Sequence, residues 1–228
     1  FVIRLSGHAL STQLADEVFE AAVKLNYNPE FFEGVTPKRV DQFFEQKGLF
    51  VCPEDQMIKW THGTKGCLAS HWSIWEMVAE SDEPVVVLEH DGLPIRDVAP
   101  ILPLVKDVCH LDRFIPFSTN IDNYFDIYSK HVQERFWEGV IPYPKEPFYD
   151  TIVVTGSSFR GTYGYIVKPS GARKLLQFGK THGVFPSDRI ICENAVELQR
   201  ANGTYVRLHP FFKDLDIQRK TSTRYQMF

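Results

Sequence analysis

Cysteine is scarce in this sequence, and no pattern ties the cysteines together. The four cysteines, Cys52, Cys67, Cys109 and Cys192, lie far apart among 228 residues, and no Cys-x-x-Cys pair occurs. This spacing excludes a zinc knuckle and a small disulfide scaffold. We therefore expect reduced thiols and a cytoplasmic protein, and we leave a removed leader open because the numbering can begin inside a longer precursor.

Long apolar runs, like-charged tracts and flexible linkers are also lacking. No apolar stretch approaches the ~18 residues of a membrane-spanning helix, so no transmembrane segment is expected. The net charge of −4 offers no general attraction to nucleic acid or to anionic lipid. No repeat or Gly/Ser-rich linker marks a boundary, and 43% of the residues are hydrophobic. We expect one domain over residues 1–228, and we leave the oligomeric state open.

The sequence does contain a regular alternation of strand and helix patterns. Apolar residues at helical spacing predict helices at 14–25, 66–81, 169–178 and 187–200. Branched and aromatic runs predict strands at 1–5, 29–35, 85–88, 151–155, 163–167 and 204–208. Ser170 and Ser187 are the expected N-caps of the last two helices, and the proline cluster at 140–150 is an expected loop. This alternation predicts an α/β fold with a mostly parallel sheet flanked by helices.

Three polar residues, Glu89, His90 and Asp91, stand where the strand at 85–88 ends, in the stretch VVVLEHDG. Open α/β sheets bind ligands beyond the carboxyl ends of their strands. Buried carboxylates are costly unless they are paired or hold a cation. In an extended segment Glu89 and Asp91 point to one side, which would offer oxygen ligands to Mg²⁺ or Mn²⁺ with a bridging diphosphate. The alternative is a solvated turn at Asp91.

Two other residues are candidates for the same site. His209 follows the last predicted strand, and its imidazole would supply a nitrogen ligand that suits Mn²⁺ better than Mg²⁺. The alternative for His209 is an ordinary surface histidine. Asp188, in FPSDRII, lies just inside a predicted helix start, where the unpaired N–H groups favour a carboxylate in any case. As a functional residue it would be a general base for an acceptor hydroxyl.

Other catalytic patterns are missing. Ser70 and His71 are neighbours on a predicted helix, where adjacent side chains diverge by about 100°, and no G-x-S-x-G elbow occurs, so hydrolysis is disfavoured. These two residues are expected to bind their helix to its surroundings or to contact a phosphate or sugar. The spacing of a P-loop is absent, and so is the Gly-rich basic loop typical of a nucleotidyltransferase. The aromatic-rich segment 120–150 is either an acceptor platform or a packed insertion.

Taken in order, four segments resemble glycosyltransferase family 25, which includes bacterial lipooligosaccharide and collagen hydroxylysine galactosyltransferases. They are GCLASHWSIWEMV, VVVLEHDG, GTYGYIVKPSGARKLL and FPSD, and the resemblance covers about residues 1–215. It implies a GT-A-type fold, a nucleotide-sugar donor, a divalent cation and inversion at the anomeric carbon. Where the family usually has a second aspartate this chain has His90, so the resemblance implies either fewer carboxylate ligands or a role for His90 itself.

The resemblance and the residue patterns together predict a set of site residues. Metal ligands are Glu89, Asp91 and His209, and Asp188 is the catalytic base. Leu5, Ser70, His71 and Glu89 are assigned to the binding of the donor. The predicted activity is the inverting, metal-dependent transfer of galactose or glucose from a UDP-sugar to the hydroxyl of a glycan or other hydroxylated acceptor, with Mn²⁺ or Mg²⁺ as cofactor. The alternative is an inactive domain of the same fold that binds sugar or a protein.

Overall fold

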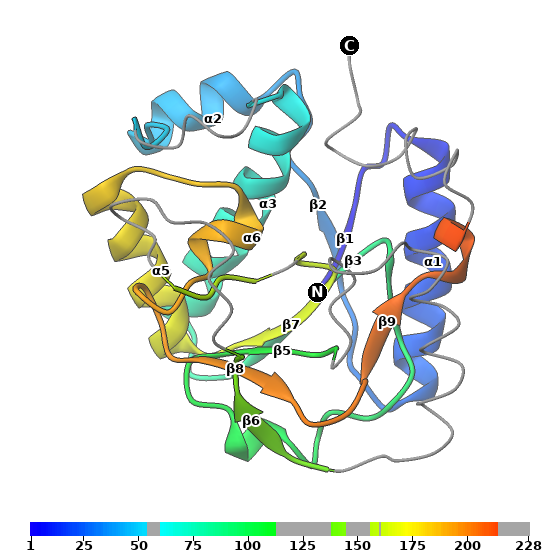
Figure 1. The fold of residues 1–228 in the computed structure, drawn as a ribbon. Helices are drawn as coiled ribbons and strands as arrows, with labels where there is room; N and C mark the ends of the chain where they lie inside the picture. Colours follow the sequence, from blue (N-terminus) through cyan, green and yellow to red (C-terminus); the bar gives the residue numbers. More distant parts are fainter. Residues whose placement is uncertain (54–59, 113–137, 145–155, 160, 214–228) are drawn as a thin grey trace.

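A computed structural model describes residues 1–53, 60–112, 138–144, 156–159 and 161–213 of the chain (Figure 1). The helices are α1 (Ala9–Lys24), α2 (Val40–Lys47), α3 (His62–Glu80), η1 (Leu102–Leu104), α5 (Pro169–His182), α6 (Ser187–Ile190) and η2 (Pro210–Lys213). The strands are β1 (Val2–Arg4), β2 (Phe31–Glu33), β3 (Val85–Glu89), β4 (Gly92–Pro94), β5 (Val108–His110), β6 (Val140–Pro142), β7 (Gly164–Val167), β8 (Leu198–Ala201) and β9 (Val206–Leu208). None of these helices is both long and apolar enough to cross a membrane.

Within the described residues, seven strands form one sheet in the order β2-β1-β3-β7-β5-β8-β6. β1 pairs in parallel with β2 and β3, and β5 pairs in parallel with β8. β7 and β6 are antiparallel to their neighbours, so the other five strands share one direction. β4 and β9 form a separate antiparallel pair. The predicted α/β class, with a mostly parallel sheet flanked by helices, is confirmed.

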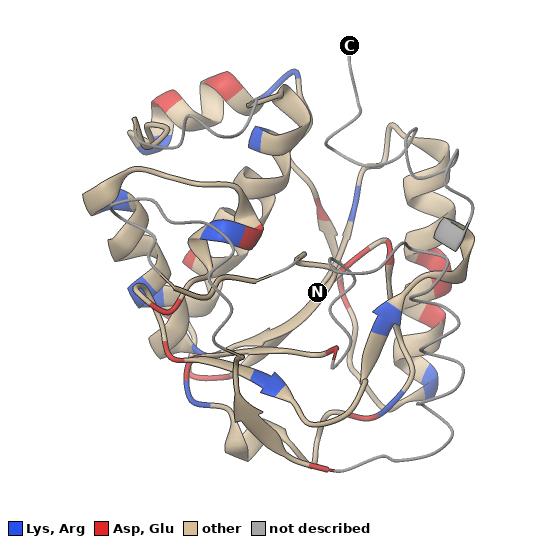
Figure 2. Ribbon diagram, viewed as in Figure 1, with Lys and Arg blue, Asp and Glu red and all other residues tan. Residues whose placement is uncertain are grey.

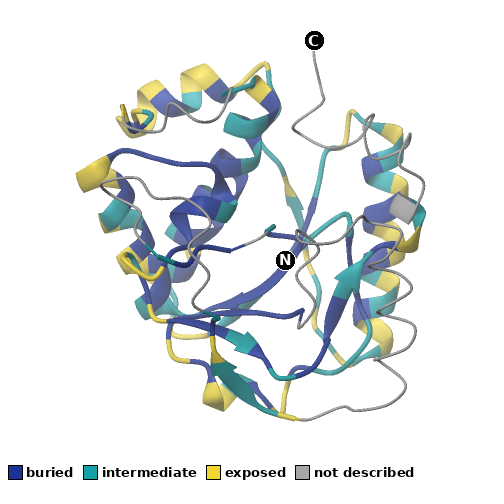
Figure 3. Cartoon of the chain, in the orientation of Figure 1, coloured by how far each residue is buried: buried dark blue, intermediate teal, exposed yellow. Residues whose placement is uncertain are grey.

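The sheet separates two hydrophobic cores, because successive side chains of a strand point to opposite faces. Tyr165 of β7 packs into one core and the next residue, Ile166, packs into the other. The first core is filled from α3 and α5, with Trp72 and Trp75 fully buried, and the second is filled from α1. Figure 3 shows β5, β7 and the inner helix faces buried, the edge strands β2 and β6 only partly buried, and exposed residues on the outer faces of the helices.

Two predicted helices start earlier in the structure than their apolar pattern does. α1 begins at Ala9, and its N-cap His8 accepts a hydrogen bond from the backbone N of Ser11 through Nδ1 at 3.2 Å. α3 begins at His62, and its N-cap Thr61 accepts from the backbone N of Thr64 at 3.0 Å. In both helices the polar cap precedes the first residue of the buried stripe.

The predicted helix over 187–200 is wrong. α6 ends at Ile190, and residues 198–201 form β8 between β5 and β6. Their backbone groups pair with strands on both sides, and this tertiary pairing overrides local helix preference. Ser187 is not a cap, because Pro186 takes that position. Ser170 is not a cap either, since Lys168 precedes α5 and Ser170 Oγ donates to Asp107 Oδ1 at 2.8 Å.

The expected loop at 140–150 is wrong at its start, where Val140–Pro142 form the edge strand β6. The predicted strand at 151–155 and most of the aromatic segment 120–150 lie outside the described residues. The predicted strands at 1–5, 29–35, 85–88, 163–167 and 204–208 are all present, each within a residue or two. Acidic and basic positions are interspersed over the described ribbon (Figure 2), in keeping with a net charge of only −4.

Candidate active site

The C-terminal ends of β1 and β3 lie side by side, because the two strands pair in parallel with Ile3 opposite Glu89. The N-terminal half of α3 lies against this edge. Gly66 of α3 packs on the chain that follows β2, where an added Cβ would lie 2.6 Å from the carbonyl oxygen of Val35. A side chain at position 66 would therefore push the helix away from the edge of the sheet.

Ser70 fastens α3 to the same chain segment. Its Oγ donates to the carbonyl of Gly66 at 2.7 Å and accepts from the backbone N of Val35 at 2.8 Å. Gly34 lies between Ser70 and Leu5, since a Cβ there would come within 3.2 Å of Ser70 Oγ and 2.9 Å of Leu5 Cδ2. The structure thus brings the predicted residues Leu5 and Ser70 together, with the Ser70 hydroxyl already engaged by backbone groups.

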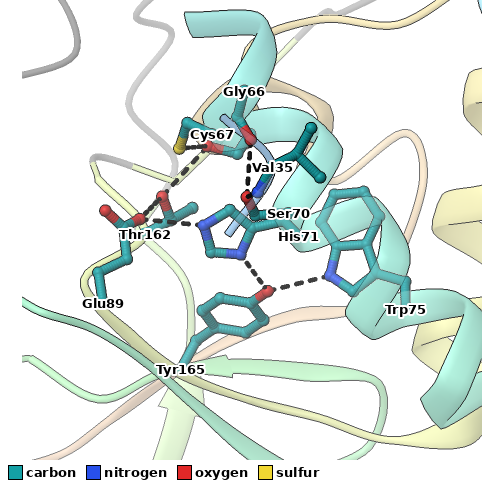
Figure 4. Close-up of polar contacts among 10 residues, drawn as sticks. Val35, Gly66, Cys67, Ser70, His71, Trp75, Glu89, Thr162 and Tyr165 are labelled. Carbon is teal, nitrogen blue, oxygen red and sulfur yellow. Dashed lines mark hydrogen bonds and ion pairs between the residues drawn. The ribbon is translucent and has the colours of Figure 1, made fainter. Parts of the chain in front are cut away.

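His71 is fully buried and has a hydrogen-bond partner at each ring nitrogen (Figure 4). Nε2 lies 3.0 Å from Glu89 Oε1, and Nδ1 lies 2.8 Å from the hydroxyl of Tyr165. That hydroxyl also accepts from Trp75 Nε1 at 3.0 Å. Thr162 donates its hydroxyl proton to Glu89 Oε1 as well. His71 therefore holds Glu89 in place from inside the protein.

These contacts keep Glu89 ionised although it is largely buried. Burial by itself would raise the pKa of Glu89, but the hydrogen bonds from His71 and Thr162 and the nearby His90 ring outweigh burial and lower it. The side chain keeps 19% of its surface exposed. β3 therefore ends in a partly exposed anion at the carboxyl ends of the parallel strands.

Asp91 lies on the turn between β3 and β4, and its carboxylate is poorly satisfied. Among the described residues, its buried Oδ1 has no hydrogen-bond partner. Burial, together with the negative charge of Glu89, raises the pKa of Asp91 well above its ordinary range. The turn is packed tightly, because a Cβ on Gly92 would lie 1.7 Å from the carbonyl oxygen of Tyr163. An unpaired buried oxygen beside a second carboxylate is an arrangement that a divalent cation would satisfy.

Electrostatic effects on Cys67 indicate that the predicted carboxylates lie near one another. Burial raises the pKa of its thiol, and the negative charges of Glu89, Asp188 and Asp91 raise it further. Ser187, the residue before Asp188, has its Oγ 3.2 Å from Cys67 Sγ and 3.2 Å from Thr162 Oγ1. These contacts tie the start of α6 to the end of β3.

His209 is joined to Asp91 through the backbone. Its N–H donates to the carbonyl oxygen of Asp91 at 2.7 Å. Its ring is engaged elsewhere, with Nε2 3.1 Å from Glu17 Oε2 and Nδ1 accepting from the backbone N of Phe211 at 3.2 Å. The backbone of this predicted ligand is therefore hydrogen-bonded to that of Asp91, whereas its imidazole contacts Glu17 of α1.

One group of possible metal-ligand atoms in the described part of the chain comprises Cys67, His71 and Glu89, which lie within 4.8 Å of one another. It shares only Glu89 with the predicted ligands. Cys67, Thr162 and Tyr165 were not predicted as site residues from the sequence. The spacing of Cys67 and His71, four residues apart on one helix, was the signal that places both on one face.

A partly buried acidic cluster at the carboxyl edge of a mostly parallel sheet is a ligand site typical of α/β proteins. The model of "Glycosyltransferase family 25 (LPS biosynthesis protein)" matches residues 9–191, and the chain belongs to this family. A "Glycosyltransferase 25 family member" of Aedes aegypti is 30% identical over 186 residues, which cover 77% of this chain and 28% of that protein. The chain thus spans under a third of that relative's length.

A solved structure of an active-site mutant of LgtC is also similar to the chain. It has a TM-score of 0.41 and 9% sequence identity, and the match covers 88% of this chain and 71% of the other. Similarity at this level does not define a function.

Proposed function

We propose that the chain is a GT-A-type domain that transfers galactose or glucose from a UDP-sugar to an acceptor hydroxyl, with inversion and with Mn²⁺ or Mg²⁺ as cofactor. Membership of glycosyltransferase family 25 supports sugar transfer. The observation that carries the proposed cation site is the buried, unpaired Oδ1 of Asp91 beside the anionic Glu89.

In this proposal Asp91 and Glu89 hold the cation, and His209 supplies a nitrogen ligand when its ring leaves Glu17. Two carboxylates and an imidazole form a donor set that Mn²⁺ accepts. A cation held there would neutralise the charge that develops on the departing diphosphate. Leu5 and Ser70 line the end of the first strand, where the nucleotide would lie, and His71 acts by orienting Glu89.

Asp188 is the proposed general base for the acceptor hydroxyl. It lies at the start of α6, is partly exposed, and acts electrostatically on the same thiol as Glu89 and Asp91. A base that removes the hydroxyl proton during a single displacement leads to inversion without a covalent intermediate. The acceptor is a glycan or another hydroxylated molecule. All four cysteines are free, which supports the reducing, cytoplasmic environment that we keep as part of the proposal.

The test is to incubate the purified chain with a panel of UDP-sugars and Mn²⁺ and to measure released UDP. We expect release with UDP-galactose or UDP-glucose and its loss in Asp91→Asn and Asp188→Asn. Asp41→Asn is the matched control, because Asp41 is exposed and pairs with Lys65 and His62 on the surface. Donor binding without any turnover would favour the alternative, an inactive domain that binds sugar or a protein.

A further inference from the structure

Two rows of polar side chains lead to the same carboxylate oxygen, Glu89 Oε1 (Figure 4). The first row begins in the core at Trp75 and passes through Tyr165 and His71, all of which are fully buried. The second begins at Cys67 and passes through Ser187 and Thr162. The first row comes from the core, and the second passes through Ser187 at the start of α6.

With a neutral His71 ring, the proton count of the first row allows one direction. An indole nitrogen can only donate, so Trp75 donates to Tyr165, and the single phenolic proton remains for His71 Nδ1. His71 then carries its proton on Nε2 and donates it to Glu89. The reverse placement, with the proton on Nδ1, would point a lone pair of Nε2 at a carboxylate 3.0 Å away and leave the buried phenolic proton without an acceptor.

The second row runs the same way. Thr162 uses its one hydroxyl proton on Glu89, so toward Ser187 it can only accept. Ser187 therefore donates to Thr162 and accepts from the thiol of Cys67, which lies 3.2 Å away. The thiol thus serves as the first donor of the row, a role that needs its proton to stay in place.

We propose that these two rows are positioning relays that saturate Oε1 of Glu89 and leave Oε2 as the oxygen presented to the cation. Among the described residues, both hydrogen bonds to this carboxylate end on Oε1. A carboxylate held at one oxygen by two donors cannot rotate freely, so its other oxygen has a defined direction. The role toward a cation rests on the proposed function, whereas the direction of the relays does not.

The second relay has a further consequence for the base. Ser187 immediately precedes Asp188, so the hydrogen bond that Ser187 donates to Thr162 and the one that it accepts from Cys67 fix the start of α6 relative to β3. The relay therefore holds the proposed base and the proposed cation ligand at a constant separation. Cys67, His71, Thr162, Tyr165 and Ser187 are positioning residues and not catalytic ones.

The direction of the first relay is tested on the unsubstituted, metal-free protein by ¹⁵N NMR of its histidines. We expect His71 to show the neutral tautomer with the proton on Nε2, and we expect Tyr165→Phe to change its Nδ1 shift. A His71 ring with its proton on Nδ1 would overturn the relay, whatever the protein does with sugars or metals.

The consequence for the cation is tested by the Mn²⁺ dissociation constant, measured from the electron paramagnetic resonance signal of free Mn²⁺. Tyr165→Phe and Thr162→Val each remove one hydroxyl with little change in shape, and we expect each to weaken Mn²⁺ binding by about tenfold. Tyr163→Phe is the matched control, because its hydroxyl donates to Asp112 outside both relays. Thr162→Ser, which keeps the hydroxyl, should restore most of the affinity.

The outcomes separate this inference from the proposed function. If the unsubstituted protein binds no Mn²⁺, the metal site of the proposed function is wrong, and the tautomer of His71 still decides the direction of the relay. If it binds Mn²⁺ and the affinities of Tyr165→Phe and Thr162→Val stay within twofold of it, the relays do not position Glu89. Thermal unfolding of each variant shows whether a loss of affinity comes from a loss of fold.

Discussion

Replacing Asp91 with asparagine is expected to stabilise the metal-free protein while removing its proposed activity. The carboxylate of Asp91 is buried, one of its oxygens has no partner among the described residues, and Glu89 is close enough to repel it. Asparagine has nearly the same shape and carries no charge. The substitution should therefore remove the repulsion between the two carboxylates and the cost of burying the Asp91 charge, which a bound cation would otherwise offset.

The size of the effect follows from the cost of burying an unsatisfied polar group, about 1–3 kcal/mol. Asparagine retains a carbonyl oxygen, so the gain should lie at the lower end, about 1 kcal/mol. For a chain of 228 residues this raises the melting temperature by roughly 2–4 °C. Glu89→Gln should act in the opposite direction, because it weakens the contacts with His71 and Thr162.

The effect should depend on pH. The pKa of Asp91 is raised in the folded state above its ordinary value of 3.8, so the folded protein holds this proton more tightly than the unfolded chain does. The contribution of Asp91 to stability is therefore fully present below pH 3.8 and is lost as the pH rises toward its folded pKa. The pKa of Glu89 is lowered in the folded state from its ordinary value of 4.5. Its contribution to stability is therefore fully present above pH 4.5 and is lost as the pH falls through its folded pKa.

The assay is thermal unfolding of the parent, Asp91→Asn and Glu89→Gln proteins in chelator, at several pH values from about 4 to 7.5, and again with Mn²⁺. We expect the advantage of Asp91→Asn over the parent to grow with pH, and we expect Mn²⁺ to stabilise the parent but not the variant. An Asp91→Asn protein that melts below the parent near pH 7 without metal would refute the reasoning.

Three other predictions concern residues around the same turn. Gly92→Ala should destabilise the fold by about 1–3 kcal/mol or more, because its Cβ meets the carbonyl of Tyr163, whereas Gly7→Ala, with open space around it, should be neutral in the same denaturant titration. Asp188→Asn should lower kcat by about 10²–10⁴-fold and leave the Mn²⁺ affinity unchanged; equal losses in both would remove its role as the base. Because burial and the surrounding carboxylates raise the pKa of the Cys67 thiol, it should resist alkylation at pH 8 until the protein unfolds, and rapid labelling followed by mass spectrometry would contradict this.

Strong periodicity explains which parts of the fold were predictable from the sequence. α1, α3 and α5 each place an apolar stripe on a core, and β3 and β7 are runs of branched and aromatic residues, so each element was expected within a few residues of its observed bounds. β4, β5 and β6 were not predicted: they have three residues each, like β1, β2 and β9, but they lie outside the branched and aromatic runs that predicted strands. β8 was predicted as helix, since only its neighbours in the sheet make it a strand.

In the site, too, single residues could be predicted from local sequence patterns, whereas contacts made by the tertiary fold could not. Glu89, Asp91 and Asp188 could be proposed as site residues from the sequence, because acidic residues at a strand end and a helix start are visible along the chain. Thr162, which donates to Glu89, and Tyr165, which contacts His71, were not predictable, because the antiparallel pairing of β3 with β7 brings them to the site. The ring of His209 contacts Glu17 of α1, a contact that no local pattern indicates.

The central claim is that the end of β3 holds a divalent cation that binds the diphosphate of a nucleotide sugar. The most direct measurement is a crystal structure of the protein soaked with Mn²⁺ and UDP, with anomalous data collected at the manganese edge. We predict an anomalous peak bonded to Asp91 and to Oε2 of Glu89, with the UDP diphosphate on its open side. A peak that lies elsewhere, or UDP bound with the Asp91 carboxylate turned away from it, would contradict the account.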